Sequence, residues 1–149
     1  MVATQPRVKS ICLIRKDDSI LVVHVYDTAR GQTFYTPLGG GVEFGERGHD
    51  AIRREFKEEI GADITDVRFV GVIENLFTLE GRPGHEIVLV YEARLTDASL
   101  YKKESFEGRD TGGPFKAEWK ALSSFNTENA PLYPEGLLDL VGKPLSTDS

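Results

Sequence analysis

The order of apolar patterns along the chain predicts an α/β (α+β) fold, a mixed β-sheet with helices packed on it. Runs rich in β-branched residues open the sequence, a segment with helical periodicity follows, and strand-like runs then return. The expected order is three strands, a helix, two strands, a polar loop, a strand and a helix. Periodicity alone does not fix how these strands pair.

The first strands follow what is expected to be a loose tail at residues 1–6. Val8–Ile14 and Ile20–Tyr26 are two β-rich runs joined by a short polar stretch that favours a hairpin. A polar loop then leads to a short strand at 33–36. The single cysteine, Cys12, lies in the apolar part of the first run and is expected to be buried and unreactive.

The helix is predicted from Gly48 to Ile60. Ile52, Phe56 and Ile60 recur every four residues, which places them on one face that can be buried. Gly61 follows directly, and glycine is the common residue just past a helix end. The segment should therefore pack one apolar stripe against the sheet.

Two further strands are predicted after the helix, at Val67–Ile73 and Glu86–Leu95. Between them, the glycines and proline of residues 80–84 indicate a turn. These segments form the second group of strands in the expected sheet.

The C-terminal third begins with polar residues 96–114, which are expected to form an exposed, functional loop. Phe115–Leu122 is the last expected strand, and Pro134–Val141 is expected to form a short helix. A second loose tail is expected at 144–149. No composition shift or linker divides the chain, so residues 1–149 are interpreted as one domain.

Composition narrows the classes of function. A hydrophobic content of 40% and a charged content of 28% are ordinary for a soluble globular protein. The net charge of −6 argues against an extended nucleic-acid surface, which needs clustered Lys and Arg. No apolar run approaches a membrane span and no signal peptide is evident, so we expect a cytoplasmic protein without membrane contact. Homodimers are common at this size.

Three carboxylates share one stripe of the predicted helix. Each helical residue turns the chain by about 100°, so Glu55 and Glu59 lie about 40° apart and Glu58 about 60° to the other side of Glu55. Like charges at this spacing destabilise a helix. Carboxylate oxygens are ligands for hard divalent cations, and the stripe therefore indicates an Mg²⁺ or Mn²⁺ site.

The segment that carries these carboxylates resembles the Nudix box, G-x5-E-x7-R-E-U-x-E-E-x-G-U, where U is apolar. Residues 40–62 match it at every fixed position, and Phe56 and Ala62 fill the apolar positions. The matching fixed residues are Gly40, Glu46, Arg54, Glu55, Glu58, Glu59 and Gly61. One departure precedes the box, because many members place proline directly before the paired glycines, where this chain has Leu38 after Pro37.

The resemblance to the Nudix hydrolases (MutT-like) implies an α/β/α sandwich around a mixed sheet, with the box as a loop–helix–loop. It implies a pyrophosphohydrolase that uses Mg²⁺ or Mn²⁺ to cleave a nucleoside diphosphate linked to another group X. The implied metal ligands are Glu55, Glu58, Glu59 and the carbonyl of Gly39. Glu55, Glu58, Arg54 and Glu46 are the implied catalytic group, in which Glu46 and Arg54 pair and orient the helix carboxylates.

Other residues are candidates for substrate binding or for proton transfer. Gly39, Gly40 and Gly41 allow a close approach of substrate and offer backbone groups to phosphate, and Arg82 is a candidate phosphate contact. The general base is left open between a box glutamate and a distant carboxylate from Glu104, Glu107 or Asp110. Specificity is expected from loops at 27–34, 77–86 and 100–114.

Alternative functions are compatible with the same fold. A ligand-binding or regulatory domain without turnover usually lacks box carboxylates, and none is missing here. An isomerase acting on a prenyl diphosphate commonly needs a cysteine in its active site, whereas Cys12 lies in an apolar strand far before the box. The substrate itself stays open among nucleoside triphosphates and diphosphates, ADP-ribose, dinucleoside polyphosphates, nucleotide sugars and RNA 5′ ends, with small nucleotides favoured.

Overall fold

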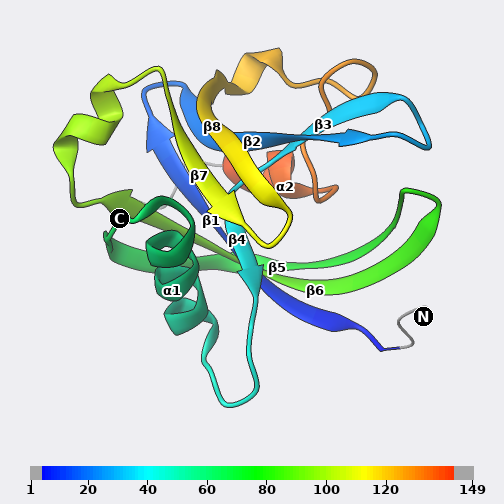
Figure 1. Ribbon diagram of the computed structural model, residues 1–149, viewed down its shortest axis with the longest axis horizontal. Helices are drawn as coiled ribbons and strands as arrows, with labels where there is room; N and C mark the ends of the chain where they lie inside the picture. The colour runs from blue at the N-terminus through cyan, green and yellow to red at the C-terminus, as the bar shows by residue number, and fades with distance from the viewer. Residues whose placement is uncertain (1–4, 143–149) are drawn as a thin grey trace.

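The computed structural model describes residues 5–142 and places a curved mixed sheet between two helices (Figure 1). The fold class predicted from the sequence is confirmed. In chain order the strands and helices are β1 (Arg7–Lys16), β2 (Ser19–Asp27), β3 (Gln32–Thr36), β4 (Gly39–Gly41), α1 (Gly48–Ile60), β5 (Ile64–Leu79), β6 (Arg82–Leu95), η1 (Ala98–Lys102), β7 (Ser105–Asp110), β8 (Gly113–Ala121), η2 (Leu122–Ser124) and α2 (Leu137–Gly142).

The sheet runs in the order β5-β6-β1-β2-β8-β7, with β3 added to β2 and β4 added to β1. Only the pairing of β1 with β6 is parallel, and β1 pairs with β4 in the antiparallel sense with Lys9 opposite Gly41. Strand β1 therefore lies at the centre of the sheet and carries the glycine segment along one of its edges.

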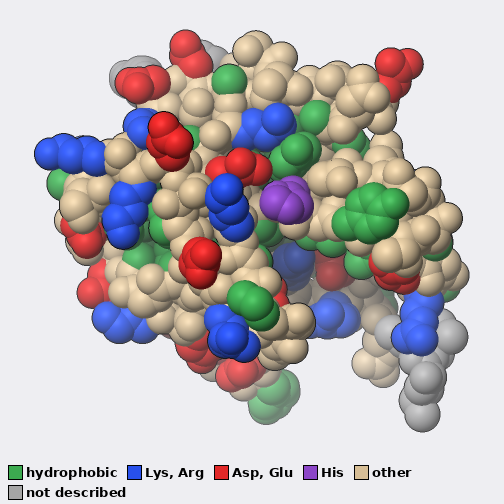
Figure 2. Space-filling view, turned by 45° about the horizontal axis from the view of Figure 1, so that its top comes forward, with side chains coloured by type: hydrophobic (Ala, Val, Ile, Leu, Met, Phe, Trp, Pro, Cys, Tyr) green, Lys and Arg blue, Asp and Glu red, His purple; other side chains and the backbone are tan. Residues whose placement is uncertain are grey.

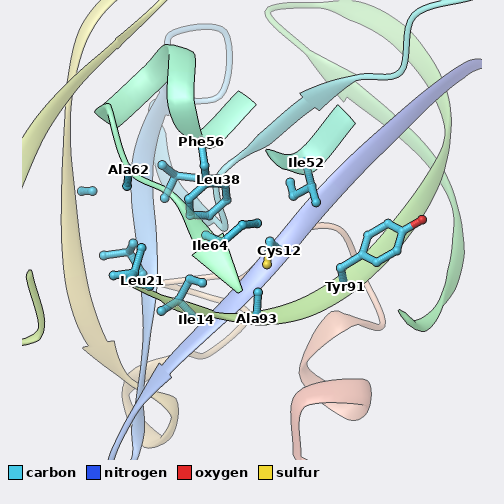
Figure 3. Packing of buried hydrophobic residues seen from close by; sticks show 12 residues of the cluster. Cys12, Ile14, Leu21, Leu38, Ile52, Phe56, Ala62, Ile64, Tyr91 and Ala93 are labelled. Atoms are coloured by element: carbon cyan, nitrogen blue, oxygen red, sulfur yellow. The ribbon is translucent and has the colours of Figure 1, made fainter. Parts of the chain in front are cut away.

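The alternation of side chains along β1 separates two cores. Cys12 and Ile14 pack in the cluster that contains Ile52 and Phe56 of α1 (Figure 3). Ile11 and Leu13 of the same strand pack in a second cluster on the other side of the sheet. That second cluster includes Leu137 and Val141 of α2. Because successive residues of a strand point to opposite faces, α1 and α2 cover opposite faces of the sheet.

Helix α1 has the bounds that the sequence predicted. Ile52 and Phe56 are fully buried, and Ile60 is half-buried against the same cluster. Gly61 ends the helix in the left-handed conformation with φ of 66°, and its N–H donates to the carbonyl of Lys57 at 3.0 Å. The local sequence pattern was sufficient to predict the bounds of α1, because the apolar stripe and the glycine that ends the helix are contiguous in the sequence.

The interpretation of 96–114 as an exposed loop was wrong. This segment contains η1 and β7, which forms a hairpin with β8. Phe106 packs against the α1-side core, and Gly108 lies against α1, where an added Cβ would be 2.7 Å from the carbonyl oxygen of Glu59. A polar strand can be stable at this position because its pairing and one face are supplied by distant segments.

The two strands after α1 are longer than expected and form one long hairpin. The predicted turn at 80–84 narrows to Glu80 and Gly81, which both have positive φ (53° and 77°), while residues 82–84 belong to β6. Strand β5 alternates half-buried and exposed residues over its second half, from Gly71 to Leu79. Polar residues such as Glu74 and Thr78, which are exposed, interrupt the apolar run, so a prediction based on apolar runs ended at Ile73.

The C-terminal helix begins later than predicted. Gly136 has a φ of 91°, which is incompatible with a right-handed helix, so α2 starts at Leu137 rather than Pro134. Of the two expected tails, 144–149 and residues 1–4 lie outside the described residues. Within residues 5–142 no helix is long and apolar enough to cross a membrane.

Candidate active site

The predicted catalytic residues meet where α1 faces the glycine strand β4. Arg54 lies at the centre of this group and donates two hydrogen bonds to Glu46, from Nε to Oε2 at 2.7 Å and from Nη2 to Oε1 at 2.9 Å. It also donates to Glu55 at 3.0 Å, to Glu58 at 3.2 Å and to the carbonyl of Gly41 at 3.0 Å. A planar guanidinium is suited to fixing several oxygens in this way.

The pairing of Glu46 with Arg54 keeps both side chains charged. Hydrogen bonds from Arg54 lower the pKa of Glu46 to about 2, and the backbone N–H of Glu43, 3.0 Å from Oε1, adds to this effect. The same bonds raise the pKa of Arg54 above its already high value. The pair thus ties the box loop to the middle of α1 by charge and geometry together.

Glu55 occupies the space that a side chain at Gly40 would need. A Cβ added to Gly40 would lie 2.4 Å from Cδ of Glu55 and 2.5 and 2.6 Å from its two oxygens. The side chain of Glu55 is 13% exposed, whereas that of Glu58 is 59% exposed. Glycine in β4 is therefore required for the close approach of the Glu55 carboxylate to the backbone.

Glu59 is the most perturbed carboxyl group of the site. Burial is the largest cause that raises its pKa, to about 9, followed by its contact with the Glu55 carboxyl and by the charges of Glu55 and Asp110. Lys9 acts in the opposite direction. When two acidic groups are in contact within a partly desolvated site, ionisation of both is energetically unfavourable. The structure thus concentrates negative charge around Glu55 and Glu59.

The donor set suits a hard divalent cation, although among residues 5–142 no three ligand-type side chains converge tightly enough to enclose an ion as they stand. The reason is visible in the contacts, since Arg54 draws Glu46, Glu55 and Glu58 toward itself. Glu59 meets only Glu55 of this group. The contact of these two carboxyl groups is a place where added positive charge would be stabilising.

Strand β7 brings one of the three distant carboxylates to this group. Asp110 ends β7, and its charge acts on Glu59. Glu107 lies an odd number of residues away on the same strand and so faces the opposite side, while Glu104 precedes the strand and is exposed. Of the three distant candidates, Asp110 is therefore the one that shares the strand face of Gly108, which packs on α1, and the one whose charge acts on Glu59.

A cavity of about 280 Å³ lies on the α2 side of the sheet. Strands β1, β2 and β3 form one part of its wall, and the end of the β5–β6 hairpin and residues 133–135 form the rest. Its lining includes Phe34, Phe77 and Tyr133 together with Lys9 and Thr36. Phe34 and Tyr133 pack edge to face with ring centroids 5.1 Å apart. Mixed aromatic and polar walls are typical of small-molecule sites.

The β2–β3 turn is tied to the tip of the β5–β6 hairpin at one side of this cavity. Asp27, 3% exposed, accepts the backbone N–H groups of Ala29, Arg30 and Glu80 through Oδ1 at 3.0 to 3.3 Å. The Glu80 carboxylate accepts from the backbone N–H of Thr28 at 2.9 Å and from its hydroxyl. These bonds hold two of the expected specificity segments, 27–34 and 77–86, against each other.

Arg82, the predicted phosphate contact, lies at the hairpin tip opposite Leu79, at the far end of the hairpin from α1 (Figure 1). The structure does not bring it to the carboxylates. Sequence reasoning missed Lys9, which lies with Ile11 on the face of β1 that lines the α2-side cavity. A charged residue that breaks the inward alternation of a strand was the available signal.

The raised pKa of Glu59 predicts how stability depends on pH without metal. Between about pH 4.5 and 9 the folded state retains a proton that the unfolded chain has lost, so the free energy of unfolding should fall as pH rises through this window. We expect the melting temperature in EDTA to decrease by several degrees from pH 5 to 9, and Glu59→Gln to flatten this dependence. Equal slopes in the two proteins would contradict the burial of Glu59.

Gly40→Ala is predicted to separate metal binding from folding. The new Cβ would displace the end of the flexible Glu55 side chain rather than backbone, so the melting temperature in EDTA should change by less than about 3 °C. The Mn²⁺ affinity, measured by titration calorimetry, should fall by about tenfold or more. The matched control is Gly41→Ala, whose Cβ would meet only the guanidinium of Arg7. If both variants bound Mn²⁺ with equal affinity, metal binding would not depend on the space that the Glu55 carboxylate occupies at Gly40.

Comparison with known proteins gives consistent results. The family model for the NUDIX domain matches residues 4–133. Solved structures with the same fold include a MutT NUDIX hydrolase from Burkholderia pseudomallei, with a TM-score of 0.65, 23% identity, and coverage of 92% of this chain and 97% of that chain. A NUDIX hydrolase from Nitrosomonas europaea has a TM-score of 0.58, 22% identity, and coverage of 80% and 74%. An ADP-ribose pyrophosphatase from Streptococcus suis has a TM-score of 0.55, 20% identity, and coverage of 87% and 81%.

Proposed function

The chain belongs to the NUDIX domain family, and we propose that it hydrolyses a diphosphate bond in a nucleoside diphosphate linked to a group X, with Mg²⁺ or Mn²⁺. Family membership makes the protein a Nudix pyrophosphohydrolase in class. The metal requirement and the small nucleotide substrate are parts of the proposal.

The observation that carries the proposal is the meeting of Glu55 and Glu59 beside Asp110, with the Glu59 pKa raised to about 9. A cluster of carboxylates that repel one another in a partly desolvated site is typical of a functional site, and a purely structural helix face would place such charges in solvent. The alternation along β7 and the glycine at residue 108 both serve to bring Asp110 to this place.

Glu55, Glu58 and Glu59, with the carbonyl of Gly39, would hold the cation. When bound, a divalent cation neutralises phosphate charge and lowers the pKa of coordinated water. Arg54 orients the carboxylates of Glu55 and Glu58 through its fixed fork. We assign to the Asp110 carboxylate the removal of the proton from the attacking water, because it shares the face of β7 that packs on α1 at Gly108 and its charge acts on Glu59.

The cavity on the α2 side would take the nucleoside or the group X. Its aromatic residues provide flat apolar surface, and its size favours a small ligand over a polymer. Acidic and basic side chains are intermingled on the face seen in Figure 2, without a broad basic patch. This distribution supports a small nucleotide in place of an extended nucleic acid.

A substrate panel with product identification tests the proposal. Purified protein is incubated with and without Mg²⁺ or Mn²⁺ and with ADP-ribose, nucleoside triphosphates, dinucleoside polyphosphates and nucleotide sugars, and products are separated by chromatography. We expect cleavage of one class at the diphosphate, only with metal. A folded protein that binds a nucleotide but releases no product from any member would instead indicate a ligand-binding domain.

A further inference from the structure

One lysine lines the cavity on the α2 side and lies opposite the glycine strand β4, whose other face the Glu55 carboxyl approaches. Lys9 lies on β1 between Gly41 of β4 and Val88 of β6, and it is half-buried. Its side chain lines the cavity on the same face as Ile11. Among the described residues that line the cavity, Lys9 is the one cation that lies opposite β4.

Lys9 has no anionic partner of its own. Within the described part of the chain, no carboxylate lies within 4.0 Å of its ammonium group, and no side-chain hydrogen bond is made by it. A half-buried lysine packs its aliphatic stem on apolar surface and keeps its ammonium group within reach of solvent. The position of Lys9 therefore provides a positive charge that an anionic ligand could neutralise.

The neighbouring strand leaves this charge accessible. Strand β4 consists of three glycines, so no β4 side chain covers Lys9 or separates it from the cluster at that edge. The space at Gly40 is taken by the Glu55 carboxyl, and the space at Gly41 by the guanidinium of Arg7, a second cation on the same face of β1. An anion that spans from the cavity to the carboxylates would pass along this edge.

We propose that the ammonium group of Lys9 binds the diphosphate of the substrate at the junction between the cavity and the carboxylate cluster. This inference rests on the proposed function and adds a substrate-binding residue outside the Nudix box. An ammonium group binds phosphate oxygens as a point charge, and it would hold the diphosphate while the nucleoside or X occupies the cavity. It would also give an acidic protein a local cation for an anionic substrate.

The experiment measures binding of inorganic pyrophosphate in the presence of Mg²⁺ by titration calorimetry. We expect Lys9→Met and Lys9→Gln to weaken pyrophosphate binding by about ten- to a hundredfold, the usual range for a charge-assisted hydrogen bond. Lys9→Arg, which keeps the charge, should stay within about fivefold of wild type. The control is Lys116→Met in β8, an exposed lysine outside the expected specificity segments, which should bind like wild type.

Two readouts separate a binding role from a structural one. The melting temperature of Lys9→Gln without metal, and its affinity for an unphosphorylated nucleoside, should match those of wild type. Wild-type pyrophosphate affinity in both Lys9→Met and Lys9→Gln would overturn the assignment of Lys9 while leaving the proposed hydrolase intact. A wild-type protein that neither binds pyrophosphate nor cleaves any member of the substrate panel would overturn both.

Discussion

Glu59→Gln should lower kcat by about a thousandfold or more while the protein stays folded. Glutamine has nearly the same shape as glutamate but cannot carry the negative charge that a divalent cation requires. Because the Glu59 carboxyl is protonated over much of the pH range in the absence of metal, its neutral replacement should not destabilise the fold. Steady-state kinetics at saturating Mg²⁺ with the substrate found by the panel measure this effect.

The control for this variant is Glu74→Gln, an exposed glutamate on β5 that should retain wild-type kcat. Mn²⁺ should raise the melting temperature of wild type and of Glu74→Gln, because it binds the native state, and should raise that of Glu59→Gln much less. A Glu59→Gln enzyme with near wild-type turnover would remove Glu59 from the set of metal ligands.

Asp110→Asn is expected to reduce kcat by about a hundredfold or more, since an amide cannot accept a proton from water at neutral pH. Asparagine keeps the size of the side chain at the end of β7, so the hairpin should be retained. If Asp110 is the base, the acidic limb of the pH profile of kcat should also change in the variant, which a purely structural effect would not produce.

Glu107→Gln offers a matched control on the same strand. Glu107 is exposed and faces away from α1, so its kcat and pH profile should equal those of wild type. If Glu107→Gln lost activity and Asp110→Asn did not, the general base would have to be assigned to the other face of β7 or to a box glutamate.

The segment around the Nudix box was predictable because its information is local. The bounds of α1, its buried Ile52 and Phe56, and its terminator Gly61 all follow from spacing within one continuous stretch. Buried Cys12 was anticipated from its apolar neighbours in the same way. In each case the residues that determine the structure are near one another in sequence, and helical or strand periodicity is enough to read them.

The remainder of the site depends on pairing between distant segments. Polar residues 105–110 become a strand only because β8 pairs with them and α1 packs on Gly108, and neither partner is visible in the segment itself. The same dependence explains why three distant carboxylates could not be ranked. Side-chain alternation on β7, once its partners are in place, turns Asp110 toward Glu59 and Glu107 away.

The sequence by itself determined the family, the box helix and the identity of the carboxylates, because these are encoded in 23 contiguous residues, 40–62. Only the tertiary structure decided which outside residues join them. Lys9 lies opposite the glycine strand because β1 pairs with β4, and the β2–β3 turn and the β5–β6 tip meet at one side of the cavity. Contacts between segments far apart in the chain depend on sheet register and packing, which no local pattern specifies.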